Sequence, residues 1–289
     1  MEAELLVQRL RAAGFTPESV VRATGGVVAL AALVTLDDGR RIFAKTLAQP
    51  GSDLFQVEAE GLGALTELGG ANTPEVLLSS PELLVLEAMR PRVDDERFWE
   101  EAGRHLARVH TTAVGDRFGW DHDGWLGRLR QENTWTGDGY EFFAQRRILR
   151  WLREPLVDAA FDADDRRALE RLCAALPDIV PPQPPVLNHG DLWTENIVAT
   201  DAGEPVFIDP AVSYTWAESD LSMVWSGNRP PQSDRFFPAY AEIAPLQDGW
   251  QERMPVMHLR EVLSVIAHDD DDWGAVAAVR ETIAPFARR

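Results

Sequence analysis

The 289-residue chain has little cysteine, little histidine and few basic residues. Its single cysteine, Cys173, cannot form an internal disulfide, and six histidines leave little for a structural zinc site. Lysine and arginine number 28 against 47 aspartates and glutamates, which gives a net charge of −19. Because so acidic a surface repels phosphate backbones and anionic lipids, we expect no nucleic-acid partner and no membrane partner. A small anionic ligand at a locally positive or metal-filled site stays compatible with this charge.

Long apolar runs are also missing. The longest, residues 27–34, falls far short of the roughly 20 residues that cross a bilayer. The N-terminus, MEAELLVQRL, is acidic and amphipathic, whereas a signal peptide begins basic and then turns apolar. The apolar share of 45% and the charged share of 26% are those of a globular protein. We expect a soluble, cytoplasmic protein, and as its oligomeric state a monomer or weak homodimer.

The first part of the chain predicts a compact lobe of strands and one or two helices. Helices are indicated over 2–12 and over 53–69, the second ending at a glycine pair. Two β-rich runs flank Asp37-Asp38-Gly39, which is typical of a hairpin. A buried strand covers 83–89. Strands and helices thus alternate irregularly, as in an α+β fold.

Beyond residue 90 the pattern becomes mainly helical. Helices are predicted over 98–110, 140–152 and 164–176, and again beyond 217. A PPQPP run at 181–185 interrupts them and leads into a different kind of structure. We therefore predict two lobes, a small β-rich one over 1–90 and a larger, mainly helical one over 91–289.

The segment after the prolines carries the strongest chemical signal. It reads NHGDLWTEN (188–196), two short strands follow, and Asp209 ends the second. This order matches the H-x-D-x-x-x-x-N motif and the strand-ending aspartate that kinases use for phosphoryl transfer. Asp191 would accept the proton of the attacking hydroxyl, and Asn196 and Asp209 would offer Mg²⁺ the hard oxygen ligands it prefers. The alternative is a structural role, in which His189 and Asp191 only form hydrogen bonds with each other in a core loop.

Two charges upstream have no simple place in a core. Lys45 lies within a strand, and Glu58 falls on the apolar stripe of the following helix. A strand lysine paired with a helix glutamate is the ion pair that holds the α- and β-phosphates of ATP in kinases. The alternatives are a lysine that snorkels at an edge and a glutamate in water at the border of the stripe. The pair Gly25-Gly26, before the first strand of the hairpin, is either a phosphate-covering loop or a simple glycine turn.

These segments resemble the fructosamine (ketosamine) kinases, within the larger aminoglycoside-phosphotransferase and protein-kinase-like group. The resemblance covers nearly the whole chain. It rests on FAKT around Lys45, FQVEAEGLGAL around Glu58, LLVLEAM, FGW (118–120), GRLRQENTW (127–135), YEFFAQRRI (140–148), NHGDLWTEN and VFIDPAVSYTWAESDLSM (206–223).

The resemblance implies a two-lobed protein-kinase-like fold with ATP between the lobes, the first being the ATP-binding lobe and the second the catalytic and acceptor-binding lobe. The backbone from Glu87 to Met89 would read adenine. The family transfers the γ-phosphate of ATP to a sugar hydroxyl, the 3-hydroxyl of fructosamines. Because the phosphorylated adduct falls apart and frees the amine, the activity counts as protein repair.

The resemblance also indicates an acceptor side. Trp193 follows Asp191 by two residues, so its indole would lie under the sugar, with His189 nearby, and Glu218 would face the cationic amine of the acceptor. The chain departs from the family here, with Thr215-Trp216-Ala217-Glu218 where Gly-x-Arg-Glu is usual. The exact acceptor is therefore left open.

Two alternatives to a fructosamine kinase are compatible with the sequence. One is a kinase of an aminoglycoside or another amino sugar, since an acidic acceptor face suits any cationic substrate. The other is a nucleotide-binding pseudokinase. The presence of all five residues that the chemistry needs argues against a pseudokinase: Lys45, Glu58, Asp191, Asn196 and Asp209.

Overall fold

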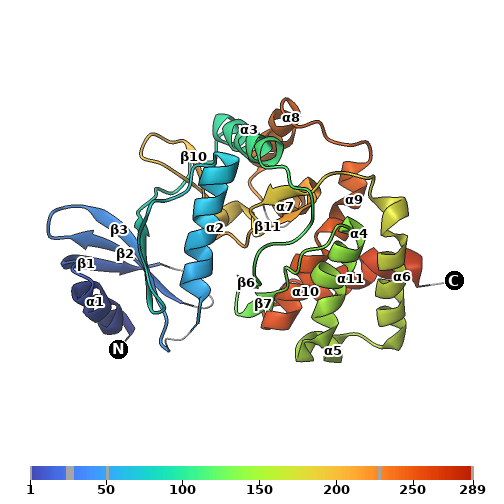
Figure 1. Ribbon diagram of the computed structural model, residues 1–289, viewed down its shortest axis with the longest axis horizontal. Coiled ribbons are helices and arrows are strands. Elements are labelled where there is room, and N and C mark those ends of the chain that lie inside the picture. Colours follow the sequence, from blue (N-terminus) through green and yellow to red (C-terminus); the bar gives the residue numbers. More distant parts are fainter. Residues whose placement is uncertain (1, 24–28, 50–51, 227–228, 288–289) are drawn as a thin grey trace.

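A computed structural model describes residues 2–23, 29–49, 52–226 and 229–287. The chain forms a smaller lobe built on a sheet and a larger lobe built mainly of helices (Figure 1). This is the predicted α+β, two-lobed architecture. Among the described residues, no helix combines the length and apolarity needed to pass through a membrane.

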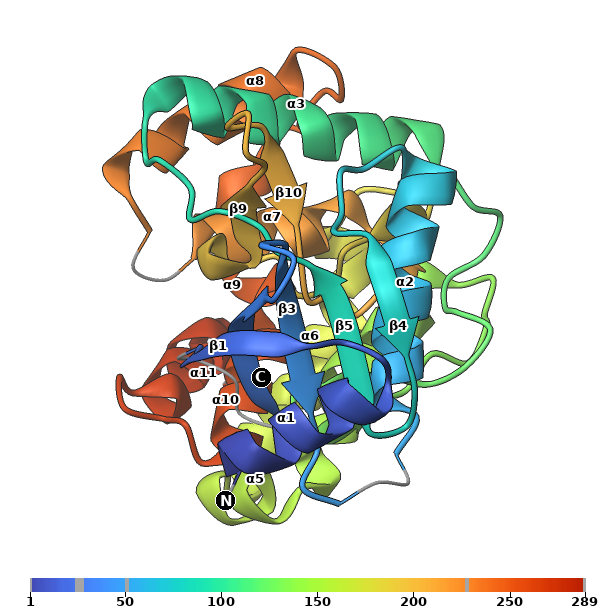
Figure 2. The same ribbon diagram turned by 90° about the vertical axis from the view of Figure 1, so that its left-hand side faces the viewer.

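The N-terminal lobe is a five-stranded antiparallel sheet in the order β1-β2-β3-β5-β4. Its strands are β1 (Pro17–Arg22), β2 (Leu30–Leu36), β3 (Arg41–Thr46), β4 (Val76–Ser79) and β5 (Leu83–Glu87). Helix α1 (Glu2–Ala12) lies across one face, and α2 (Leu54–Gly69) covers the other (Figures 1 and 2).

Strand alternation separates the two faces of this sheet and decides where Lys45 lies. Ile42 and Ala44 of β3 pack with α1 in one apolar cluster, whereas Phe43 packs in the α2 cluster. Since successive strand residues point to opposite faces, Lys45 belongs to the α2 face. The sheet therefore presents the Lys45 ammonium to the helix that carries Glu58.

The connection from β5 leads directly to the second lobe. Arg90 forms an isolated antiparallel bridge with Ala199, and their backbone N–H groups donate to each other's carbonyls at 2.8 and 2.9 Å. The division of the lobes after residue 90 remains our proposal, and it coincides with this crossing.

The C-terminal lobe is built around α3, which packs along α8 (Figure 2). Its helices are α3 (Glu96–Thr112), α4 (Gly139–Phe142), α5 (Pro155–Ala160), α6 (Ala163–Ile179), α7 (Ala217–Trp225), α8 (Phe236–Ala241), α9 (Trp250–Met257), α10 (Leu259–His268) and α11 (Ala275–Ile283). Short 3₁₀ helices cover Leu149–Arg153, Thr194–Asn196, Pro231–Arg235 and Ala284–Phe286. Trp99, Trp151 and Trp216 are fully buried in its core.

Three short antiparallel strand pairs complete this lobe. They are β6 (Gly124–Leu126) with β7 (Leu129–Gln131), β8 (Val186–Asn188) with β11 (Ser213–Thr215), and β9 (Ile197–Ala199) with β10 (Pro205–Phe207). The β9–β10 hairpin carries residues 196 and 209 at its two ends. The hairpin thereby brings together backbone positions that are 13 residues apart in the sequence, since the N–H of Ile208, next to Asp209, donates to the Asn196 carbonyl at 3.1 Å.

The helix predicted over 140–152 is wound differently along its length. After α4, residues Phe143–Ile148 form a π-helix and Leu149–Arg153 a 3₁₀ helix. Arg147 in the π segment is buried and donates to Asn133 Oδ1 at 2.7 Å and to Ser213 Oγ at 2.9 Å. A widened turn accommodates this inward-pointing guanidinium while its apolar neighbours remain in the core.

Candidate active site

Lys45 joins the two lobes through a pair of carboxylates. Its Nζ lies 2.7 Å from Glu58 Oε1 in α2 and 2.5 Å from Asp209 Oδ1 beyond β10. Burial disfavours the ammonium, but the charges of Asp209 and Glu58 outweigh it and raise the pKa of Lys45. Burial raises the pKa of Glu58 to about 7, with Lys45 opposing and Asp209 adding to the rise. The structure thus brings the predicted lysine–glutamate pair together.

Asp209, just after β10, has an unusual backbone conformation. Its φ of 57° is in the left-handed region, which residues other than glycine rarely adopt. Such strain concentrates at functional sites, where the surrounding structure enforces it. Here the turn directs the carboxylate back toward Lys45, and the side chain keeps 42% exposure to solvent.

Asp191 and Asn196 lie side by side in the segment before β9. Asn196 Nδ2 donates to the Asp191 carbonyl at 2.7 Å and lies 3.4 Å from its carboxylate Oδ2. Burial raises the pKa of Asp191 to about 8, Glu261 adds to the rise, and Arg260 opposes it. A base with such a pKa is well matched to proton transfer near neutral pH. With its nitrogen directed to Asp191, Asn196 has its Oδ1 left to offer to a cation.

Asp220 of α7 fixes the loop that carries Asp191 by accepting hydrogen bonds from its backbone. This fully buried carboxylate accepts the N–H of His189 at 2.7 Å and that of Gly190 at 2.8 Å. Gly190 has φ +80°, and a Cβ there would lie 2.1 Å from the Ala211 carbonyl oxygen. Only glycine fits this position. We did not single out Asp220 from the sequence, although a carboxylate on an apolar helix face within E-S-D-L is a usable signal.

His189 holds the same loop from within. Its ring is fully buried, Nε2 donates to the Ile208 carbonyl at 2.9 Å, and Nδ1 accepts the Asp191 N–H at 3.2 Å. Burial lowers the pKa of His189, which keeps the ring neutral in this arrangement. The assignment of His189 to the acceptor is therefore corrected, because both ring nitrogens are occupied by the protein.

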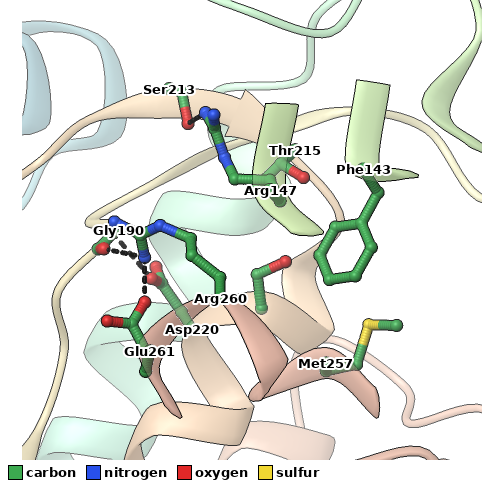
Figure 3. Close-up of a pocket in the computed structure, with 10 residues that line it drawn as sticks. Phe143, Arg147, Gly190, Ser213, Thr215, Asp220, Met257, Arg260 and Glu261 are labelled. Carbon is green, nitrogen blue, oxygen red and sulfur yellow. Dashed lines mark hydrogen bonds and ion pairs between the residues drawn. The ribbon is translucent and has the colours of Figure 1, made fainter. Parts of the chain in front are cut away.

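Arg260 of α10 also contacts this loop, close to Asp220 (Figure 3). The buried guanidinium donates to the Gly190 carbonyl at 2.5 Å and to Gln131 Oε1 at 2.5 Å, and it forms an ion pair with Glu261. Figure 3 shows Gly190, Asp220, Arg260 and Glu261 meeting beside a small cavity. Sequence reasoning missed Arg260 and Gln131, since a single arginine or glutamine in an amphipathic segment carries no specific pattern.

The residues predicted for the acceptor fall in different places. Trp193 is 46% exposed just after Asp191, which keeps it available for an acceptor. Glu218 is buried, and its two oxygens accept from Arg253 at 2.5 and 2.8 Å. The prediction that Glu218 faces the amine is corrected, because this carboxylate is neutralised inside the lobe. Trp216 belongs to the core, packed against Phe143.

The remaining nucleotide-binding predictions concern the first lobe. Glu87 ends β5, and Met89 lies between it and the Arg90 crossing to β9. Their backbone therefore runs along the join of the lobes, where adenine contacts stay a prediction. Gly25 and Gly26 lie outside the described residues.

The donor set of the site fits a magnesium ion. Among the described residues, no three His, Cys, Asp or Glu side chains gather as a metal cluster. Mg²⁺ needs only one or two protein oxygens beside phosphates and water. Asp209 and Asn196 offer such oxygens from neighbouring positions, since the Ile208 N–H donates to the Asn196 carbonyl at 3.1 Å.

Comparison with known proteins gives these residues a family. The family model described as fructosamine kinase matches residues 2–276. "Probable ketoamine kinase slr1563" of Synechocystis is 30% identical over 79% of this chain and 78% of its own. The chloroplastic protein-ribulosamine 3-kinase of Oryza sativa subsp. japonica is 29% identical over 78% of this chain and 67% of its own.

The fold agrees with this assignment. The crystal structure of a "putative fructosamine-3-kinase" from Thermobifida fusca YX-ER1 superimposes with a TM-score of 0.84 at 32% sequence identity. It covers 98% of this chain and 97% of its own. The predicted resemblance and the kinase-like fold class are thereby confirmed, and the chain belongs to the fructosamine kinase family.

Proposed function

We propose that this protein transfers the γ-phosphate of ATP, with Mg²⁺, to the 3-hydroxyl of a ketosamine, a sugar adduct on an amine. The observation that carries the proposal is one site uniting Lys45, Glu58 and Asp209 with the Asp191–Asn196 pair. The family supplies the enzyme class, a phosphotransferase with an alcohol acceptor. The names of the relatives, ketoamine kinase and ribulosamine 3-kinase, support this acceptor class.

Each side chain has a physical task in this reaction. The Lys45 ammonium, kept charged by its carboxylate neighbours, would attract the phosphates of ATP. Asp209 and Asn196 would hold Mg²⁺, which neutralises phosphate charge when bound. Asp191, whose pKa is raised to about 8, would take the proton of the acceptor hydroxyl while Asn196 holds its orientation.

The acceptor is proposed to lie beside Trp193. This indole is the exposed aromatic residue next to the Asp191 loop, and an indole face suits a sugar ring. A ketosamine carries a cationic amine, which the acidic character of the molecule favours. An aminoglycoside or amino sugar shares this charge, so the assay must compare them directly.

An ADP-release assay tests the proposal. Purified protein with ATP and Mg²⁺ is offered a fructosamine, a ribulosamine, a free amino sugar and an aminoglycoside, with Asp191→Asn as the inactive control. We expect the highest kcat/KM on a ketosamine, loss of activity in chelator, and phosphate on the 3-hydroxyl by nuclear magnetic resonance. A higher kcat/KM on an aminoglycoside would show that the acceptor is an aminoglycoside and not a ketosamine. MgATP binding with no ADP release on any acceptor would indicate a pseudokinase.

A further inference from the structure

The β6–β7 hairpin of the larger lobe reaches across to the smaller one. Asp53, directly before α2, accepts two hydrogen bonds on its Oδ1. Arg130 NH2 of β7 donates at 2.8 Å, and Trp125 Nε1 of β6 donates at 2.9 Å. The Arg130 guanidinium also lies 3.9 Å from the centre of the Trp125 ring, which holds the two donors together. One carboxylate oxygen thus fixes the start of α2 to the hairpin.

The next residue of the same strand faces the opposite way. Gln131 is buried, donates from Nε2 to the Ala211 carbonyl at 3.0 Å, and accepts on Oε1 from Arg260 at 2.5 Å. Successive residues of a strand point to opposite faces. Therefore Arg130 faces the smaller lobe while its neighbour faces the segments that carry the chemistry.

These contacts are continuous with both halves of the site. Arg260 also donates to the Gly190 carbonyl, one residue before Asp191, and Ala211 lies two residues after Asp209. On the other side, Asp53 lies five residues before Glu58, which pairs with Lys45. The buried hydrogen bonds of Gln131 are costly to break. When the Asp191 loop shifts, the hairpin is therefore expected to move with it while these hydrogen bonds stay intact.

We propose that the β6–β7 hairpin couples the two lobes. In this role Gln131 links the hairpin to the Asp191 loop through Arg260. Arg130 and Trp125 hold Asp53 and so position α2, which carries Glu58 and its pair with Lys45. The three hairpin residues are positioning residues and do not touch the reacting atoms. This inference rests on the proposed function only in that the site binds a nucleotide.

Hydrogen exchange with AMP-PNP and Mg²⁺ as the probe tests the coupling without any acceptor. In the wild type, we expect the nucleotide to slow exchange in α2 and also in residues 124–131 and in α10. In Asp53→Ala, protection of α2 should remain, as should that of α10, whose Arg260 contacts the Asp191 loop directly, while the gain of protection in the hairpin is lost. Asp53→Asn keeps an oxygen acceptor and should restore part of the gain. Equal hairpin protection in wild type and Asp53→Ala, or no hairpin protection in the wild type, would overturn the proposal.

Kinetics provide a second readout. Asp53→Ala and Arg130→Ala should each lower kcat about 5- to 20-fold, the lower part of the range for coupling between sites. The double variant should lose no more than the larger single loss, since both changes remove one contact. Arg235→Ala is the matched control. Its guanidinium is similarly exposed and lies 2.9 Å from Glu96 within the larger lobe, so kcat should hold.

Additive losses, or an equal loss in Arg235→Ala, would count against coupling and favour a general stability effect. Melting temperatures of all variants separate these cases. If no ketosamine is phosphorylated, the proposed function fails, yet the exchange pattern with AMP-PNP still decides the coupling. The two proposals can therefore fail independently.

Discussion

Asp191 combines a raised pKa with a fixed orientation. Its carboxylate is partly buried next to Glu261, and Asn196 holds the adjoining backbone. A carboxyl that stays protonated up to about pH 8 makes a stronger base than an exposed aspartate once ionised. The same surroundings that raise the pKa of Asp191 therefore set the pH at which it can accept a proton.

Asp191→Asn should lower kcat by about 10²–10⁴ while the KM for ATP stays within about threefold, because only the proton acceptor is lost. In the wild type, kcat/KM should rise with pH, reach half its maximum near pH 8 and level off above it, because the base acts in its ionised form. The variant should lack this rise. Steady-state kinetics from pH 5.5 to 9 measure both effects. A variant with the wild-type pH profile would remove Asp191 from the role of base.

Glu218 shows that a carboxylate within a functional motif can serve the fold alone. Its bidentate pair with Arg253 is buried on both sides, with 4% and 7% of the side chains exposed. Glu218→Gln would leave the guanidinium buried without its counter-charge. We expect the free energy of unfolding to fall by about 3 kcal/mol, with equal effects on cationic and neutral acceptors. Denaturant unfolding and kinetics on both acceptor types check this. A selective rise of KM for cationic acceptors would return Glu218 to the acceptor site.

At the scale of elements, the Asp191 loop depends on one close backbone approach. Gly190 combines φ +80° with the contact to the Ala211 carbonyl, whereas Gly203, in the β9–β10 turn, has φ +84° with no heavy atom near its would-be Cβ. Both glycines have a positive φ that would strain an alanine, but they differ in packing. Comparing alanine variants of the two glycines therefore separates the effect of the contact with the Ala211 carbonyl from the effect of the positive φ.

Gly190→Ala should lower kcat by at least 10²-fold, because the loop must move away from Ala211, while Gly203→Ala should cost about 1 kcal/mol of stability and leave kcat unchanged. Kinetics and denaturant unfolding of both variants measure this. Similar kinetic losses in the two would show that backbone strain, and not the approach to Ala211, governs the loop.

The elements predictable from the sequence are those with strong local signals. The α1 and α2 helices and the β2–β3 hairpin follow from apolar spacing and a turn dipeptide, and the structure has them close to the predicted bounds. The edge strands β1 and β4 were not predicted. Each lies at an edge of the sheet and has only half-buried and exposed residues, so neither carries the apolar signal of a buried strand.

The site divides in the same way. Lys45, Glu58, Asp191, Asn196 and Asp209 belong to spaced motifs, so the sequence alone could single them out. The residues that support the loop belong to no such spaced motif, and Asp220 alone among them has a sequence signal, as a carboxylate on an apolar helix face. Asp220, Arg260 and Gln131 act through hydrogen bonds to backbone atoms 30, 70 and 80 residues away. Contacts of a side chain with a distant backbone group leave no repeating pattern in the sequence.

At the scale of the whole molecule, an acidic protein of net charge −19 must attract a nucleotide that is itself an anion. The phosphates are expected to meet the buried ammonium of Lys45 and a metal ion proposed at Asp209 and Asn196. The carboxylate of Asp209 belongs to the larger lobe and Lys45 to the smaller one, so their 2.5 Å contact also spans the join. The metal would therefore bind the same Asp209 carboxylate that contacts Lys45 between the two lobes.

Asp209→Ala should therefore weaken MgATP binding more than 100-fold, since it removes the carboxylate ligand and leaves the phosphates facing an acidic protein. Asp201→Ala, in the neighbouring β9–β10 turn, removes an equal charge that forms an ion pair with the exposed Arg90 and should leave binding unchanged. Titration calorimetry with ATP, in Mg²⁺ and in chelator, measures both. Wild type and Asp201→Ala should lose affinity in chelator, whereas Asp209→Ala should be insensitive to it. Mg²⁺-dependent binding that persists in Asp209→Ala would place the metal elsewhere.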